Sequence, residues 1–432
     1  MLEMILEDIA KSPTAYHAAA TACEHLTEAG YERLSETGAW SLKEGGRYMV
    51  TRNNSSVIAF RMPRREPEGF RMVASHSDSP CFRVKSAAEL SVKNHYIQLN
   101  TECYGGMIMS SWLDRPLSLA GRVVVRTAEG VETRLVDLAQ DMVVIPNVPI
   151  HFNREINDGY KFNPQIDLLP LFSSGAEKGV YAAKLAKAAG VEPGDVLASD
   201  IWLYVTQKPF VWGPKQEYLS TPRYDDLGCV FTTLKSFLTA ADCNAVPIWC
   251  MFDNEEVGSR TKQGADSDLL ESVLRRIVAS IGHGEEKYRR MLAGSMLVSA
   301  DNAHAVSPNH PEKTDAENCV YMNEGIVIKY SANQQSTTDA VSAGIFAAVL
   351  DKAGIPHQSF ANRSDIRGGS TLGNIAGSHV SVPSLDIGLA QLAMHSACET
   401  AGTADVDYMI RGIKAYYEAD IRCPEDGKYR LG

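Results

Sequence analysis

The chain has 432 residues, of which 44% are hydrophobic and 22% are charged, and its formal net charge is −11 at pH 7. A net anion is repelled by nucleic acid and by anionic membrane surfaces, so we expect neither as a partner. The chain begins without a basic segment followed by an apolar core, and no stretch approaches the roughly 18 apolar residues of a membrane-spanning helix. Length and composition favour a soluble globular protein of two or three domains.

Nine cysteines are scattered along the chain, and none of them forms a Cys-x-x-Cys pair. An odd number of cysteines without close pairs argues against a disulfide framework and against a thiolate zinc site. Reduced thiols are typical of the cytoplasm, and we therefore expect a cytoplasmic protein.

The amino-terminal part, residues 1–85, predicts a helix followed by strands. Ser12 is the expected cap of this helix, and Pro13 suits its first position. An apolar stripe follows at helical spacing, and Gly30 ends it. YMVTRNNSSVIAFRM (48–62) then predicts a β-hairpin that turns at its two asparagines. We interpret residues 1–85 as the first part of a main domain.

Residues 86–208 show a different pattern and predict mainly β structure. VKNHYIQLN (92–100), LAGRVVVRT (119–127) and IWLYV (201–205) alternate or are rich in β-branched residues. The long helical pattern in this part is AEKGVYAAKLAKAAG (176–190). We therefore predict a β-rich domain that is inserted into the main domain.

Strands alternate with helices from residue 209 to 432, the second part of the main domain. Buried-strand runs are PIWCMF (247–252), GSMLVSA (294–300), GIVIKYS (325–331) and SVPSLDIG (381–388). Helical patterns lie between or after them, at 269–281, 336–354 and 406–420. This alternation predicts an α/β fold with a mainly parallel sheet flanked by helices. In such sheets, polar sites gather at the carboxyl ends of the strands.

Histidines and carboxylates follow five of these strands or turns. They are His76 and Asp78 after FRMVAS (70–75), Asp225-Asp226 after Tyr224, Glu255-Glu256 after PIWCMF, Asp301 and His304 after GSMLVSA, and His395 after SLDIGLAQLAM (384–394). Each group alone has a plainer explanation, because a lone histidine is more often structural and paired acids usually form a solvated turn or helix start. The plainer explanations do not suffice for all the groups together, because we expect adjacent carboxylates after an apolar strand to be buried. Such burial is too costly unless cations compensate.

Two divalent metal ions would supply this compensation. Histidine and carboxylate ligands without cysteine suit catalytic zinc, which is our first expectation, or cobalt or manganese. Asp78 is suited to accept the second ring N–H of the histidine two residues earlier. The residues alone do not decide between Asp225 and Asp226, or between Glu255 and Glu256, as metal ligands.

The motifs occur in the order found in a known family. HSD (76–78), RYDD (223–226), FDNEEVGS (252–259), SADNAHAVSPN (299–309) and QLAMHS (391–396) resemble those of the M18 family of metallopeptidases, the aspartyl aminopeptidases. IPNVPIHFNREINDGYKFNPQIDLLPL (145–171), KYSANQQS (329–336) and RGGSTLG (367–373) are similar to that family too. The resemblance covers nearly the whole chain. It implies the zinc-peptidase fold, in which a dimerisation domain is inserted into the catalytic domain.

The resemblance assigns the metal ligands that the residues alone leave open. It makes Asp225 the carboxylate that bridges two metal ions. His76 and Asp301 would complete one metal site. Glu256 and His395 would complete the other site.

The resemblance also suggests roles in catalysis and in substrate binding. It makes Glu255 the general base and Asp78 the residue that orients the first histidine ligand. Lys329 would face the side chain of the substrate's first residue, and pairing with a local acid or with solvent is the alternative. His304 is expected to stabilise the oxyanion or to be a structural donor. His151 would reach a neighbouring subunit's active site, or be an ordinary surface histidine.

We therefore expect a two-metal aminopeptidase that hydrolyses the amino-terminal residue of a peptide and prefers Asp or Glu. The family forms dodecamers built from dimers, so the resemblance implies a homo-oligomer. One alternative is a metal-dependent deacylase or carboxypeptidase on the same scaffold. Others are an inactive family member that serves as an assembly scaffold or cargo protein, and an aminopeptidase that prefers neutral apolar residues. The complete ligand set with Glu255 argues against the inactive member.

Overall fold

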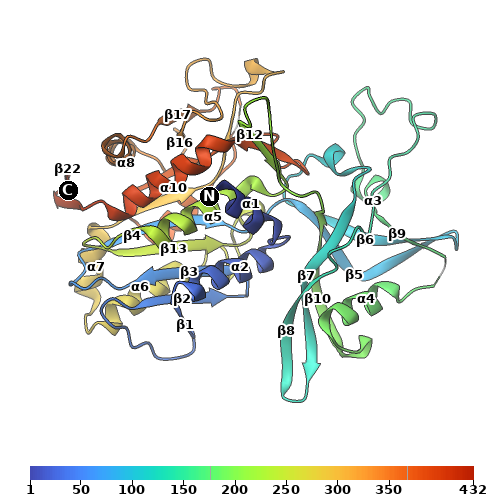
Figure 1. Ribbon diagram of the computed structural model, residues 1–432, viewed down its shortest axis with the longest axis horizontal. Helices are drawn as coiled ribbons and strands as arrows, with labels where there is room; N and C mark the ends of the chain where they lie inside the picture. The colour runs from blue at the N-terminus through green and yellow to red at the C-terminus, as the bar shows by residue number, and fades with distance from the viewer. Residues whose placement is uncertain (176, 367) are drawn as a thin grey trace.

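The computed structural model describes residues 1–175, 177–366 and 368–432, and the chain folds into two lobes (Figure 1). The larger lobe contains a nine-stranded sheet with helices on both faces. The smaller lobe contains a separate six-stranded sheet formed by residues 81–205. Within the described residues, no helix is long and apolar enough to cross a membrane.

The nine-stranded sheet is mainly parallel near its centre. Its order is β1 (Glu32–Leu34), β2 (Arg47–Arg52), β3 (Ser56–Arg61), β13 (Val246–Phe252), β4 (Phe70–His76), β14 (Met296–Ala300), β18 (Ser384–Gly388), β16 (Ile326–Tyr330) and β17 (His357–Ala361). Strands β13, β4, β14 and β18 are parallel to one another, whereas β2–β3, β3–β13 and β18–β16 pair antiparallel. This arrangement confirms the predicted α/β class. The carboxyl ends of the central strands meet at one edge of the sheet.

Two apolar cores cover the two faces of this sheet. Helices on one face are α1 (Leu2–Ala10), α2 (Ala15–Glu28), α5 (Tyr224–Thr239), α8 (Ala340–Ala353) and α10 (Thr403–Glu418), and those on the other face are α6 (Leu269–Ser280), α7 (Glu285–Ala293) and α9 (Leu372–His379). Along β4, Val73 packs in the first core, and Met72 and Ala74 pack in the second. A strand that is buried on both faces is mostly apolar at successive positions, which explains the apolar run from Met72 to Ala74.

The prediction that Ser12 caps the first helix is wrong. A short helix, α1, precedes this point, and the next helix begins at Ala15 after Thr14. The Ser12 hydroxyl is directed into the structure, where it donates to the Thr21 hydroxyl at 3.4 Å. The predicted end of the helix is confirmed, because Gly30 follows it with φ +81°, a conformation that glycine adopts without steric cost.

The smaller lobe is an antiparallel sheet with its own apolar core. Its strand order is β8 (Gly130–Asp137), β7 (Leu117–Thr127), β10 (Val196–Val205), β5 (Cys81–Val92), β6 (Tyr96–Tyr104) and β9 (Leu171–Ser174). Two helices accompany it, α3 (Pro164–Asp167) and α4 (Val180–Ala189). Helix α4 lies within the helical pattern predicted over 176–190, whose first residue is outside the described residues.

A third, five-stranded sheet lies beside the carboxyl edge of the main sheet. Its order is β11 (Phe210–Trp212), β12 (Tyr218–Thr221), β20 (Glu399–Gly402), β19 (Ala390–Leu392) and β15 (Ala303–His304). The chain ends with the hairpin of β21 (Ile421–Glu425) and β22 (Lys428–Leu431). Because β15 follows Asp301 and β20 follows His395, this small sheet holds two of the segments that carry predicted ligands.

Candidate metal centre

The five side chains predicted as metal ligands lie together at the carboxyl edge of the main sheet. His76 ends β4, Asp301 follows β14, Asp225 lies at the start of α5, Glu256 lies in a 3-10 turn after β13, and His395 lies between β19 and β20. They form two overlapping groups, each able to hold a metal ion: His76, Asp225, Asp226 and Asp301 in one, and Asp225, Glu256 and His395 in the other. Three of them end or follow parallel strands of the main sheet, and the start of α5 and the small sheet bring the other two, although up to 319 positions separate these residues in the sequence.

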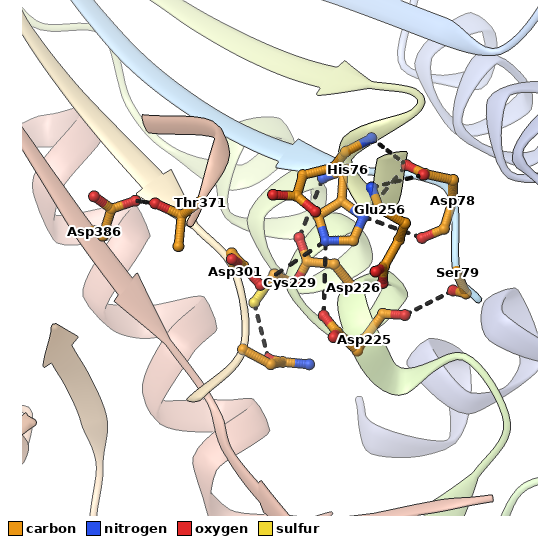
Figure 2. Close-up of polar contacts among 12 residues, drawn as sticks. His76, Asp78, Ser79, Asp225, Asp226, Cys229, Glu256, Asp301, Thr371 and Asp386 are labelled. Atoms are coloured by element: carbon orange, nitrogen blue, oxygen red, sulfur yellow. Dashed lines mark hydrogen bonds and ion pairs between the residues drawn. The ribbon is translucent and has the colours of Figure 1, made fainter. Parts of the chain in front are cut away.

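Asp225 is common to both groups. Its Oδ1 lies 3.7 Å from His76 Nε2, and its Oδ2 lies 3.4 Å from His395 Nε2. His76 Nε2 is also 3.8 Å from Asp301 Oδ1, and His395 Nε2 is 3.3 Å from Glu256 Oε1. Figure 2 shows the contacts from the His76 ring to Asp225 and Asp301. Two ligands of one tetrahedral zinc ion are about 3.4 Å apart, so these separations match a shared cation.

Both histidines turn Nε2 toward the centre because their other ring nitrogen has a partner. His76 Nδ1 lies 3.0 Å from the carbonyl oxygen of Asp78, and His395 Nδ1 lies 2.6 Å from that of Gly106. A carbonyl oxygen can only accept, so Nδ1 carries the proton in both rings. In the neutral ring, the Nε2 lone pair is then available to a metal ion.

Buried carboxylate oxygens in the centre also fit a cation. Asp225 Oδ1, Asp226 Oδ1 and Glu256 Oε1 make no hydrogen bond to any of the described residues. Such oxygens are costly to bury without a compensating charge. Imidazole nitrogens and carboxylate oxygens are also the donors that catalytic zinc takes in proteins. The residues present therefore fit a divalent metal ion.

Asp226 has a different environment from its neighbour Asp225. Its Oδ2 accepts the backbone N–H of His76 at 3.1 Å, which ties it to strand β4. Burial raises the pKa of Asp226 well above its usual range, and the nearby Asp301 carboxylate raises it further. One oxygen of Asp226 thus serves the backbone, whereas each oxygen of Asp225 faces a histidine.

Asp78 connects the first histidine to the two glutamates. Its Oδ1 accepts the backbone N–H of Glu255 and its Oδ2 that of Glu256, both at 3.1 Å. The Asp78 carboxylate lies 3.5 Å from His76 Nδ1, farther than the Asp78 carbonyl oxygen at 3.0 Å. The main-chain oxygen therefore makes the closer contact with the ring, and the carboxylate holds the backbone of the Glu255–Glu256 turn.

Glu399 holds two of the ligand-bearing segments and was missed by the sequence interpretation. Its Oε2 accepts the backbone N–H of Asp225 at 3.0 Å, and its Oε1 accepts that of His395 at 2.7 Å. Glu399 is buried at the start of β20. The only signal in the sequence is a single glutamate four positions after a histidine. A single glutamate is usually exposed, so the pattern gave no reason to select it.

Lys329 is buried near the end of β16 and contacts the segment that follows β14. Its Nζ donates to the carbonyl oxygens of Asp301 at 2.8 Å and Asn302 at 3.2 Å, and lies 3.3 Å from Asp301 Oδ2. An ammonium group has three donors, and these contacts can occupy all three. The described residues thus show Lys329 paired with a local acid. Its contact with substrate stays a prediction.

The other predicted residues lie around the ligands or away from them. Glu255 precedes Glu256 in the turn and is half-buried. His304 is exposed on β15, with its ring 6.4 Å from that of Phe360. His151 lies in an exposed loop of the smaller lobe. Within one chain, it is not among the described residues that gather at the centre.

Metal binding at His395 is expected to release protons at pH 8. Burial alone would lower the pKa of His395, but contacts with Asp225 and Glu256 outweigh it and raise the pKa to about 11. The metal-free ring is therefore protonated at pH 8, and a metal takes only the neutral ring. Below that pKa, the apparent dissociation constant for the metal should fall about 10-fold for each unit by which the pH rises. Calorimetric titration at pH 8 in buffers of different ionisation enthalpy measures the release, and heats that do not depend on the buffer contradict it.

Comparison with known proteins identifies the family of the chain. Residues 9–417 match the family described as aminopeptidase I zinc metalloprotease (M18). A probable M18 family aminopeptidase 2 of Clostridium novyi (strain NT) is 42% identical over 422 residues, which are 96% of this chain and 97% of that protein. These matches confirm the family resemblance of the motifs.

Solved structures of the family share the fold. A chain in the cryo-EM structure of the Ape4 and Nbr1 complex superposes with a TM-score of 0.92 at 32% identity, covering 96% of this chain and 85% of that chain. The S. cerevisiae mApe1 dodecamer superposes with a TM-score of 0.86 at 25% identity, covering 96% of both chains. The chain therefore belongs to the M18 family of zinc metalloproteases and is a metallo-aminopeptidase.

Proposed function

We propose that the protein uses two divalent metal ions to remove amino-terminal residues from peptides. Zinc is the expected metal, and cobalt and manganese are the alternatives. In this proposal His76, Asp225 and Asp301 hold one ion, and Asp225, Glu256 and His395 hold the other. The observation that carries the proposal is the position of Asp225, which directs one oxygen toward each histidine. When bound, the two ions supply Lewis-acid polarisation of the scissile carbonyl and lower the pKa of a water.

Glu255 is the proposed general base. The neighbouring Glu256 is a proposed metal ligand. The backbone N–H of Glu255 donates to the Asp78 carboxylate, which fixes its position. Burial raises the pKa of Glu255 to about 9, so it binds a proton more strongly than an ordinary glutamate. A carboxylate that binds a proton more strongly than usual is suited to the role of a general base. Glu255 would take a proton from the attacking water and pass it to the leaving amine.

A peptidase assay with matched substrates tests the proposed function. Peptides with a free amino terminus should be cleaved, and the same peptides with an acetylated amino terminus should not. A chelator should abolish cleavage, and zinc, cobalt or manganese should restore it. Cleavage of the acetylated peptides would favour a deacylase or carboxypeptidase. Metal-replete protein that cleaved neither set would favour an inactive scaffold or cargo protein.

We expect the enzyme to prefer amino-terminal Asp or Glu. If the Lys329 ammonium pairs with the substrate carboxylate, the charge-assisted bond is worth roughly 1.5–3 kcal/mol, or about 10–100-fold in kcat/KM. Lys329→Leu should remove most of that preference and keep the metals. The measurement compares kcat/KM for peptides that begin with Asp, Glu and Leu. A variant that lost metal instead would show that Lys329 holds Asp301 in position for the metal.

A preference for neutral apolar residues is the second candidate. The observation that favours it is the contact geometry of Lys329, whose three donors have partners on Asp301 and Asn302. An ammonium group engaged in this way has no donor left for a substrate carboxylate. Faster cleavage of the Leu peptide by the wild-type enzyme would select this candidate.

We also propose a cytoplasmic homo-oligomer, a dodecamer built from dimers, in which His151 enters a partner's active site. All nine cysteines are free, which supports a reducing compartment. The mApe1 relative is described as a dodecamer. Next to His151 in the sequence, the apolar side chains of Val148, Ile150 and Phe152 are exposed on the smaller lobe. Exposed apolar groups of this kind suit an interface.

Phe152→Asp is expected to weaken this assembly and to lower activity together with it. Phe152 is 84% exposed, so the substitution disturbs a surface and spares the core. Light scattering and peptidase activity should be measured on the same samples. His151→Ala should lower activity without changing the molecular mass. A fully active monomer of the intact protein would contradict the assembly proposal.

A further inference from the structure

A segment that begins with the last residue of β6 in the smaller lobe contacts the metal centre in the larger lobe. This segment, residues 104–111, contains the Gly106 carbonyl oxygen that lies 2.6 Å from His395 Nδ1. The backbone N–H of Ile108 also donates to the carbonyl oxygen of His395 at 3.0 Å. The smaller lobe therefore sets the orientation of one candidate ligand.

The first residue of this segment, Tyr104, contacts the other side of the centre. The Tyr104 hydroxyl donates to Asp78 Oδ2 at 2.6 Å and accepts from Asn254 Nδ2 at 2.9 Å. Its ring packs edge-on against Trp202 of β10, with 4.9 Å between ring centroids. Burial raises the pKa of Tyr104 above its usual range, and the Asp78 charge adds to this effect, so the hydroxyl keeps the proton that it donates.

Both partners of the Tyr104 hydroxyl hold the Glu255–Glu256 turn. Asp78 accepts the backbone N–H groups of the two glutamates. Asn254 directly precedes the turn and has φ +64°. The Asn254 Oδ1 also accepts from Thr261 and Gln263, at 2.9 and 2.7 Å. A single hydroxyl from the smaller lobe thus joins the two side chains that fix the start of the turn.

We propose that Tyr104 is a positioning residue of the metal centre, through which the smaller lobe holds Asp78 and Asn254 and thereby the turn that carries Glu255 and Glu256. The proposal rests on the proposed two-metal function. Without the hydroxyl, Asp78 Oδ2 would keep only the N–H of Glu256 among the described residues, and Asn254 Nδ2 would lose its acceptor. The turn could then relax away from the ligands on β4 and α5. This relaxation should affect metal binding and kcat more than KM. The Tyr104 hydroxyl bonds to Asp78 and Asn254, so we expect it to make no direct contact with substrate.

Tyr104→Phe tests the proposal, with Tyr181→Phe as the matched control. Tyr181 is a buried tyrosine of the same lobe, and its hydroxyl makes no hydrogen bond to any described residue. The zinc dissociation constant is measured by chelator competition, and kcat and KM are measured at saturating zinc. We expect Tyr104→Phe to bind zinc about 10-fold more weakly, within the usual range for loss of an outer hydrogen bond, and to lower kcat by a similar factor. KM should change less than about 2-fold, and Tyr181→Phe should match the wild type.

The outcomes separate this inference from the proposed function. Wild-type zinc affinity and kcat in Tyr104→Phe would overturn the inference and leave the proposed function standing. A wild-type protein without zinc affinity would overturn both. Thermal unfolding of the metal-free variants supplies a further readout. A loss of stability in Tyr104→Phe with zinc affinity and kcat unchanged would show a merely structural role and overturn the inference.

Discussion

Glu255→Gln is expected to lower kcat by roughly 10²–10⁴-fold, the usual contribution of a general base. Glutamine keeps the shape of the side chain but cannot accept the proton of the attacking water. The bond from the Glu255 backbone N–H to Asp78 does not depend on the side chain, so the turn should stay in place. Metal content should therefore barely change. Steady-state kinetics and metal analysis of the same preparation measure both quantities.

Glu256→Gln is the matched comparison for this prediction. Glu256 Oε1 lies 3.3 Å from His395 Nε2, so this glutamate is placed as a ligand and its substitution should lower metal content. The two adjacent variants should thus fail in different ways, one in the proton transfer and the other in metal binding. If Glu255→Gln lost its metal and regained activity when metal was restored, the roles of the two glutamates would have to be exchanged.

Asp225→Ala is expected to lower metal occupancy at both sites. Each Asp225 oxygen faces a different histidine, so its removal takes a ligand from both ions. Asp226→Ala is the control, because one oxygen of Asp226 is committed to the backbone N–H of His76. The control should keep at least one site well occupied. Metal analysis after dialysis against a fixed metal concentration measures the occupancies.

The reverse result would move the bridging role by one residue. Full loss of both metals in Asp226→Ala, with one site retained in Asp225→Ala, would assign the shared carboxylate to Asp226. Loss of a single metal in Asp225→Ala would leave two separate sites without a bridge. Each of these patterns is distinguishable from the expected one by the number of ions per chain.

The fold class and the kind of site could be inferred from the pattern of residues along the chain. The strands β4, β13 and β14 are buried on both faces, so each contains a run of successive apolar residues that is visible without a structure. Polar residues directly after such runs have to lie at the carboxyl edge of the parallel sheet. His76 and Asp301 could be recognised on this ground. The helix start at Ser12 was wrong, because local capping preference does not include the packing of α1 before it.

The groups that surround the ligands and hold them could not be inferred in this way, because they come from distant parts of the chain. Glu399 contacts the backbone of Asp225 across 174 positions, and Tyr104 contacts Asn254 across 150. These contacts depend on how the small sheet and the smaller lobe dock against the main sheet, and a local pattern of residue types does not encode that docking. The structure also shows Lys329 paired with Asp301, a choice between partners that burial and distance decide. Ligands that end strands are thus predictable from sequence periodicity, whereas their supporting hydrogen bonds arise only when distant segments pack together.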